Sequence, residues 1–133
     1  MAFRLRAAAA LAVLLGFGAS AGEPKKGGDR RPDLTLLFFT APWCGPCKAV
    51  APILEKAHRK HPKRVQLVIV DYDTAVDEVR RWGVEEIPVV IGLGRGGEVA
   101  FRAEGAGAET LRELEAGIVR FLERARKKGG KRQ

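Results

Sequence analysis

Two cysteines, Cys44 and Cys47, are the residues of this 133-residue chain whose type and spacing best suit chemistry. They are its only cysteines, and Gly45 and Pro46 stand between them. If a helix begins near Gly45, its unpaired N–H groups and its positive dipole end favour the thiolate of Cys44. Cys47 then lies one turn on, close enough to attack a mixed disulfide formed by Cys44, and Pro46 suits the first turn. The pair therefore predicts thiol–disulfide exchange.

The sequence is less consistent with two other roles for the pair. A structural crosslink across so short a loop would remove little chain entropy. A zinc site would recruit His58 and His61, but their spacing falls short of the usual finger pattern. In one helix over 45–61, His58 would lie roughly 16 Å from Cys47 at 1.5 Å per residue. We therefore expect no metal, and we expect both histidines at a partly exposed helix end.

The first 21 residues have the pattern of a signal peptide. Arg4 and Arg6 precede the apolar run Ala7–Phe17, and the small residues at 19–21 suit a signal peptidase. The run is shorter than the about 20 residues that a membrane span requires. We expect cleavage after Ala21 and export to the periplasm or the medium; the alternative is an uncleaved N-terminal membrane anchor.

Charge divides the rest of the chain into a single domain, 34–126, and two flanks. The formal net charge is +8. Residues 22–33 have the composition of a disordered linker and 127–133 that of a disordered basic tail. Such a tail can contact an anionic membrane surface weakly. Nucleic acid is not expected as a partner, because the aromatic residues lie mainly in apolar runs. The basic residues in the flanks and in the last positions of the domain are Lys25, Lys26, Arg30, Arg31, Arg124, Arg126, Lys127, Lys128, Lys131 and Arg132.

Hydrophobic periodicity predicts alternating strands and helices. Leu34–Thr40 and Val65–Val70 are apolar runs of strand length. Thr74 can cap a short helix that ends at Arg81, with Val76 and Val79 facing inward. Further strands are predicted at Val89–Ile91 and Glu98–Arg102, and a last helix at Ala108–Arg126.

The glycines of Gly92–Gly97 formally match a dinucleotide-binding fingerprint. That fingerprint requires a helix after the glycines, whereas Glu98–Arg102 has the pattern of a strand. A hairpin turn that uses positive φ angles is the better interpretation.

Together, the motif Trp43–Lys48 (WCGPCK) after the first strand and Ile87-Pro88 before the third resemble the thioredoxin family over about Leu34–Arg126. The resemblance implies a thioredoxin-like α/β fold with a four-strand mixed sheet in the order 2-1-3-4. It implies that Cys44 is the nucleophile and Cys47 the resolving thiol. Trp43, Gly45, Pro46, Ile87 and a cis Pro88 would bind substrate, with the Ile87 backbone pairing with an extended peptide.

The chain departs from the family at two places. Phe38 stands where thioredoxins bury an aspartate, six residues before Cys44, and Ile69 corresponds to the usual lysine. Losing the candidate proton acceptor predicts slower resolution by Cys47. Residues 22–33 are also too few for the family's first strand and helix, so Val65–Val70 becomes an edge strand that the linker or a partner would cover.

The sequence thus predicts an exported, monomeric thiol–disulfide oxidoreductase without a cofactor. The Gly-Pro dipeptide resembles that of reducing thioredoxins, so reduction is favoured over oxidation. A reductase outside the cytosol requires an electron source, and a membrane donor is the candidate partner. The alternative is a non-catalytic peptide-binding module on the same fold.

Overall fold

The apolar runs of the sequence form one mixed sheet in the computed structural model, which describes residues 30–130. β1 (Leu34–Thr40) is central, parallel to β2 (Val65–Asp71) and antiparallel to β3 (Val89–Gly94), and β4 (Val99–Glu104) pairs antiparallel with β3. The order β2-β1-β3-β4 confirms the predicted four-strand sheet. Because β1 and β3 are the inner strands, their sequences are apolar on both faces.

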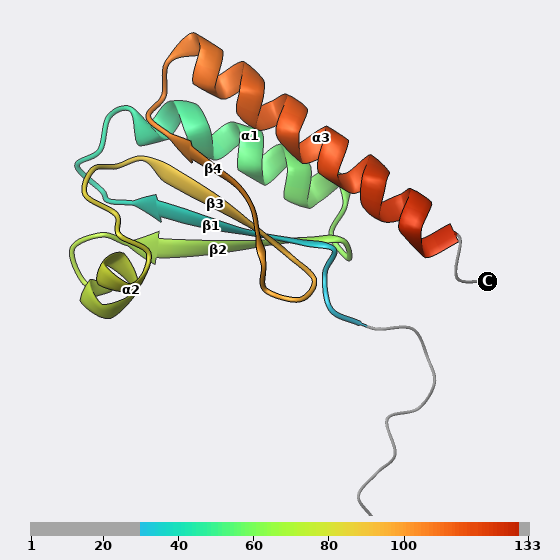
Figure 1. Ribbon diagram of the computed structural model, residues 1–133. Helices are drawn as coiled ribbons and strands as arrows, with labels where there is room; N and C mark the ends of the chain where they lie inside the picture. Colours follow the sequence, from blue (N-terminus) through green and yellow to red (C-terminus); the bar gives the residue numbers. More distant parts are fainter. Residues whose placement is uncertain (1–29, 131–133) are drawn as a thin grey trace, which may run out of the picture.

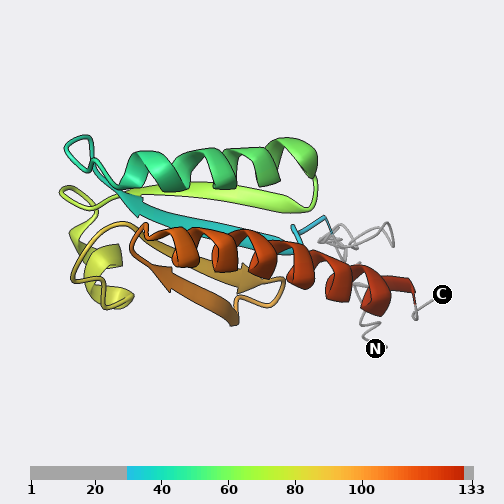
Figure 2. The same ribbon diagram turned by 90° about the horizontal axis from the view of Figure 1, so that it is seen from above.

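Helices cover the two faces of the sheet unequally. α1 (Cys47–Lys60) and α3 (Ala108–Gly130) lie side by side on one face, as Figures 1 and 2 show. α2 (Val76–Arg81) lies on the other face, at the end of β2. The reactive motif follows β1 directly, so its position depends on how firmly β1 is held.

Alternate residues of β1 anchor it in two apolar clusters. Leu34, Leu36 and Phe38 pack under α1 and α3, while Phe39 packs on the face that carries α2. Each such side chain contributes roughly 1.5–3 kcal/mol when fully buried. The partners on the helices are Val50 and Leu54 of α1 and Leu114, Ile118 and Leu122 of α3.

Two helices begin later than the sequence predicts. α1 starts at Cys47 rather than near Gly45, because its first turn is closed by bonds from Lys48 N–H to the Gly45 carbonyl and from Ala49 N–H to the Pro46 carbonyl, both 3.1 Å. Cys44 therefore precedes the helix.

α2 starts at Val76, and Thr74 does not cap it. Asp71 Oδ1 accepts hydrogen bonds from the N–H groups of Asp73 and Thr74, which shapes a turn before the helix. Val76 is 47% exposed, so the predicted inward position was wrong for Val76, whereas Val79 packs as expected.

α3 also ends later than predicted. It continues through Gly130, so 127–130 are helical rather than part of a disordered tail. The last three residues of that tail, like the predicted signal peptide and most of the linker, lie outside the described residues. Within 30–130, no helix has the length and apolar character needed to cross a bilayer.

The glycine run forms the β3–β4 hairpin, as predicted, with a φ of +83° at Gly97. The strand extends further into the run than expected, through Gly94. Gly92 is required by close packing, since a Cβ there would lie 2.5 Å from ring atoms of Phe101.

Replacing Gly92 with alanine is expected to destabilise the fold by about 1–3 kcal/mol, because the Phe101 ring must move from its cluster. The matched control is Gly117→Ala in α3, where an added Cβ would meet nothing within 4 Å. There the removal of a helical glycine is expected to stabilise by about 0.5–1 kcal/mol. Urea unfolding of both variants measures the difference, and equal effects would contradict the packing argument.

The edge position of β2 is confirmed. Ile69 on this strand is 58% exposed. The described part of the linker, 30–33, lines a hollow together with Gln66, near the start of β2. What covers the remainder of the edge stays a prediction.

Candidate active site

Cys44 and Cys47 lie beyond the end of β1 and are joined by a disulfide with an S–S distance of 2.08 Å. The Cys44 N–H donates to the Ala41 carbonyl, which fixes the loop. The Cys47 N–H donates to Cys44 Sγ at 3.2 Å. A helix-terminal N–H thus points at the Cys44 sulfur, which favours negative charge there after reduction.

Exposed residues surround a nearly buried disulfide. Cys44 and Cys47 are each 4% exposed, whereas Trp43 is 64% exposed and Gly45 and Pro46 are also exposed. Most of the cysteine surface packs in the apolar cluster under α1 and α3. A substrate therefore has to contact the exposed rim to meet a sulfur.

Trp43 is held by a residue that sequence reasoning missed. Its indole Nε1 donates to Asp73 Oδ2 at 2.8 Å, across 30 residues of sequence. In the sequence, Asp73 marks only the polar end of the apolar run Val65–Val70. The sequence did hold a signal for this bond. Asp73 carries a hydrogen-bond acceptor just past the end of β2, and β2 ends beside the end of β1, where Trp43 lies.

The Ile87–Pro88 peptide bond is cis, as the resemblance implied. Ile87 packs against the apolar cluster to which both cysteines belong. The β3 pairing with β1 ends at Val89, so the Ile87 backbone lies past the last paired residues. Two bonds hold the loop: Tyr72 Oη donates to the Glu85 carbonyl at 3.0 Å, and Gly105 N–H donates to the Pro88 carbonyl at 2.9 Å.

Comparison with known proteins adds independent evidence. The family model described as thioredoxin matches residues 29–120. The chain belongs to the thioredoxin family. It is 37% identical over 82 residues to thioredoxin from Bacillus subtilis, a match that covers 61% of this chain and 78% of that protein. It is accordingly a thioredoxin-like thiol–disulfide oxidoreductase with a CxxC redox pair.

Solved thioredoxin structures share its fold. Oxidised mitochondrial thioredoxin 3 from Saccharomyces cerevisiae matches with a TM-score of 0.56 and 31% identity, covering 67% of this chain and 79% of that one. Thioredoxin from Trypanosoma brucei brucei matches with a TM-score of 0.59 and 29% identity, covering 71% and 80%.

The interior of the protein next to the cysteines is apolar. Phe38 is 3% exposed and shares a cluster with Cys47. Ile69 is the register partner of Phe38 on β2, but its side chain is 58% exposed rather than buried beside Phe38. The β2 side chains in this cluster are instead Leu67, two residues earlier, and Val65. Because β2 is an edge strand, the side chain of Ile69 near its C-terminal end is not fully covered by other residues.

The histidines lie at the far end of α1, as expected. His58 Nδ1 is 2.7 Å from the Val65 carbonyl oxygen, which ties the helix to the start of β2. Burial lowers the pKa of His61 below its usual 6.5, and the charges of Arg64 and Lys60 lower it further. These neighbours favour the neutral ring.

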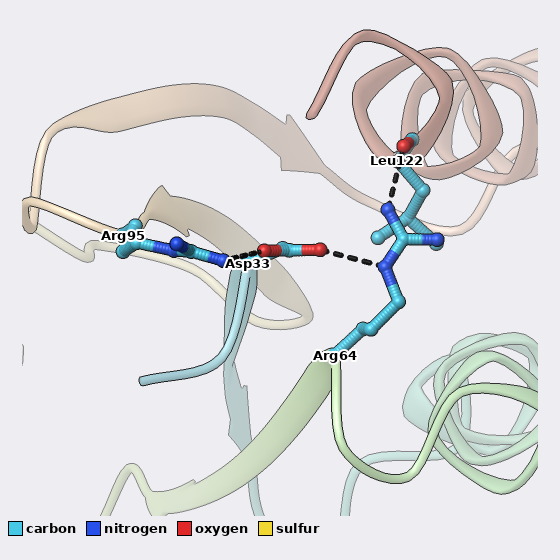
Figure 3. Close-up of polar contacts among 4 residues, drawn as sticks. All are labelled: Asp33, Arg64, Arg95 and Leu122. Atoms are coloured by element: carbon cyan, nitrogen blue, oxygen red, sulfur yellow. Dashed lines mark hydrogen bonds and ion pairs between the residues drawn. The ribbon is translucent and has the colours of Figure 1, made fainter. Parts of the chain in front are cut away.

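A polar network that the sequence did not predict joins four segments at the end of the sheet opposite the cysteines (Figure 3). Arg64 Nε donates to Asp33 Oδ2 at 2.6 Å, and its Nη2 donates to the Leu122 carbonyl at 2.7 Å. Arg95 bonds the other Asp33 oxygen. Burial tends to raise the pKa of Asp33, but the hydrogen bonds and charges of the two arginines outweigh it and lower the pKa below 3.8.

Asp33→Asn is expected to cost about 1.5–3 kcal/mol at pH 7, because Asp33 accepts charge-assisted hydrogen bonds and is 14% exposed. Since the folded-state pKa is lowered, this stabilisation is present above about pH 4 and is lost as the pH falls through the folded value. Urea unfolding at neutral pH and near pH 3 measures the loss.

The control for this network is Glu115→Gln, which removes an exposed carboxylate 3.6 Å from Lys56. It should cost less than about 1 kcal/mol. The assigned network would be contradicted if Asp33→Asn lowered the free energy of unfolding by the same amount in acid as at neutral pH, or by no more than Glu115→Gln does.

Proposed function

We propose that this protein reduces disulfides of exported proteins, with Cys44 as the nucleophile and Cys47 as the resolving thiol. The observation that carries the proposal is the Cys47 N–H directed at Cys44 Sγ, 3.2 Å away. It stabilises a thiolate on Cys44 in preference to Cys47, because the helix-terminal N–H donates to only one of the two sulfurs.

The reaction consists of two exchanges. The Cys44 thiolate attacks one sulfur of the substrate disulfide, forms a mixed disulfide and releases the other sulfur as a thiolate, which takes up a proton. Cys47 loses its proton and attacks Cys44 Sγ, which breaks the mixed bond and releases the second substrate thiolate. Two electrons pass to the substrate, and the Cys44–Cys47 disulfide forms.

Substrate docking is assigned to the exposed rim and the cis-proline loop. An extended peptide would pair with the Ile87 backbone, which lies past the β3 ladder, in the manner of an added strand. Trp43, Gly45 and Pro46 would line the approach to the sulfurs. Pro88 offers no N–H next to them, which favours an apolar contact.

Export and the electron source belong to the same proposal. The pattern of residues 1–21 supports export, with cleavage after Ala21, and the Gly45-Pro46 dipeptide supports the reducing direction. The electrons would come from a membrane protein that presents a dithiol. Basic residues at the end of α3, Lys127 and Lys128 among them, would add a weak attraction to the anionic membrane surface.

The deciding experiment measures the reduction potential of the Cys44–Cys47 pair and its redox state in the exported fraction of cells. A reductase is expected to have a potential near that of thioredoxin, about −270 mV, and to be largely reduced in place. A potential near about −120 mV with a fully oxidised pair would instead show an oxidase.

A further inference from the structure

Three segments lie at the end of the sheet that carries the redox pair, and all their charged side chains are carboxylates. They are 71–73 from the last residue of β2, 85–87 before β3, and 104–106 from the last residue of β4. Hydrogen bonds tie them to the site and to one another, from Trp43 to Asp73, from Tyr72 to Glu85 and from Gly105 to Pro88. The carboxylates are Asp71, Asp73, Glu85, Glu86 and Glu104.

Three of these carboxylates have structural partners, and two do not. Asp71 accepts from N–H groups of its own turn, Asp73 from Trp43, and Glu104 pairs with an arginine of β4 at 2.6 Å. Glu85 and Glu86 are exposed and, within the described part of the chain, form no hydrogen bond or ion pair through their side chains. They immediately precede the Ile87 backbone proposed to bind substrate.

Few basic side chains near the redox pair are available to neutralise these carboxylates. Arg102 is engaged: its guanidinium pairs with Glu104 and donates to the carbonyls of Trp82 and Gly83. Lys48, next to Cys47, is exposed and is the basic residue nearest the cysteines in sequence. Charges on α2 are balanced, since Asp77 and Glu78 are matched by Arg80 and Arg81.

The positive net charge of the chain arises elsewhere. Basic residues gather at the opposite end of the sheet, where Figure 3 shows two of them on Asp33. The seven residues of β1 separate the two ends by about 23 Å at 3.3 Å per residue, nearly three Debye lengths of about 8 Å. At the redox pair the local carboxylates therefore dominate. The distant residues are Arg30, Arg31, Lys63, Arg64, Arg95, Arg124, Lys127 and Lys128.

We propose that this site prefers disulfides flanked by lysine or arginine, and that Glu85 and Glu86 receive those side chains. The preference rests on the proposed function, because it acts while a substrate docks along Ile87. Two exposed ion pairs change a rate by roughly two- to twentyfold in total. The preference should fall as salt rises.

The test uses the full chain, kept reduced by dithiothreitol, and two peptides with one internal disulfide each. The peptides differ only in lysines or glutamates beside the cysteines. The readout is the ratio of kcat/KM for the lysine peptide to that for the glutamate peptide. We expect a ratio of about five or more at low salt, falling toward one near 1 M salt, where the Debye length is about 3 Å.

The double variant Glu85→Gln/Glu86→Gln should lower this ratio at least about twofold. The matched control is Glu55→Gln/Glu123→Gln, which removes the same charge from exposed positions on α1 and α3 and should leave the ratio unchanged. Salt dependence of the wild-type ratio tests the proposal even if the double variant fails to fold.

Two failures can be told apart. Equal reduction of both peptides by the wild type, or an unchanged ratio in the double variant, overturns the charge preference and leaves the reductase proposal intact. Reduction of neither peptide above the rate of dithiothreitol alone overturns the proposed function and, with it, this inference.

Discussion

Cys44→Ser is expected to lower insulin reduction, followed as turbidity, to the rate that dithiothreitol gives alone. A serine hydroxyl does not ionise near neutral pH, so the N–H of Cys47 has no thiolate to stabilise. The only other cysteine of the chain is Cys47, which supplies this N–H to Cys44 Sγ and so does not receive the same stabilisation. The variant should fold normally, since the change is small in volume.

Cys47→Ser separates the two steps. Cys44 can still attack, but nothing resolves the product, so a stable mixed disulfide with the substrate should accumulate and be visible as a band that thiols release. If wild type and Cys44→Ser instead give the same turbidity curve, catalysis is not the role, and the peptide-binding module becomes the better explanation.

The parts of the site that the sequence predicted depend on local patterns. The apolar run of β1 predicts a buried strand, the CxxC motif directly follows it, and Ile87-Pro88 directly precedes β3. The sheet order 2-1-3-4 was predicted from the resemblance to thioredoxins, whose first strand and helix have no counterpart in residues 22–33. The cis state of Pro88 came from the resemblance alone.

The parts that escaped prediction depend on contacts between distant residues. Asp33 and Arg95 are 62 positions apart, and Trp43 and Asp73 are 30 apart. The sequence around a charged linker residue such as Asp33 looks the same whether its side chain is solvated or forms an ion pair with a distant residue. The start of α2 was missed for a local reason: Asp71 accepts hydrogen bonds from the N–H groups of Asp73 and Thr74, and this turn delays the helix to Val76.

Phe38→Asp is expected to accelerate resolution by Cys47 about ten- to a hundredfold near neutral pH. Phe38 belongs to the same buried cluster as Cys47 and lies near the end of β1 that leads to the cysteines. We therefore expect a carboxylate there to accept the Cys47 proton as the thiol attacks. Burial should raise the pKa of the new carboxyl, and the acceleration should therefore grow as the pH rises through that value. The rate of this step is measured by rapid mixing, as the rate at which Cys47 releases the second substrate thiol from the mixed disulfide with Cys44.

The stability cost must be separated from this chemistry. Removing the ring leaves a cavity that costs about 3–5 kcal/mol, and an ionised carboxylate without a partner adds to it, since Leu67 rather than a lysine packs nearby. Phe38→Asn is the matched control: it creates a similar cavity but cannot accept the proton. If both variants resolve at the same rate, or if Phe38→Asp is slower than wild type, the apolar interior is not what limits the second exchange.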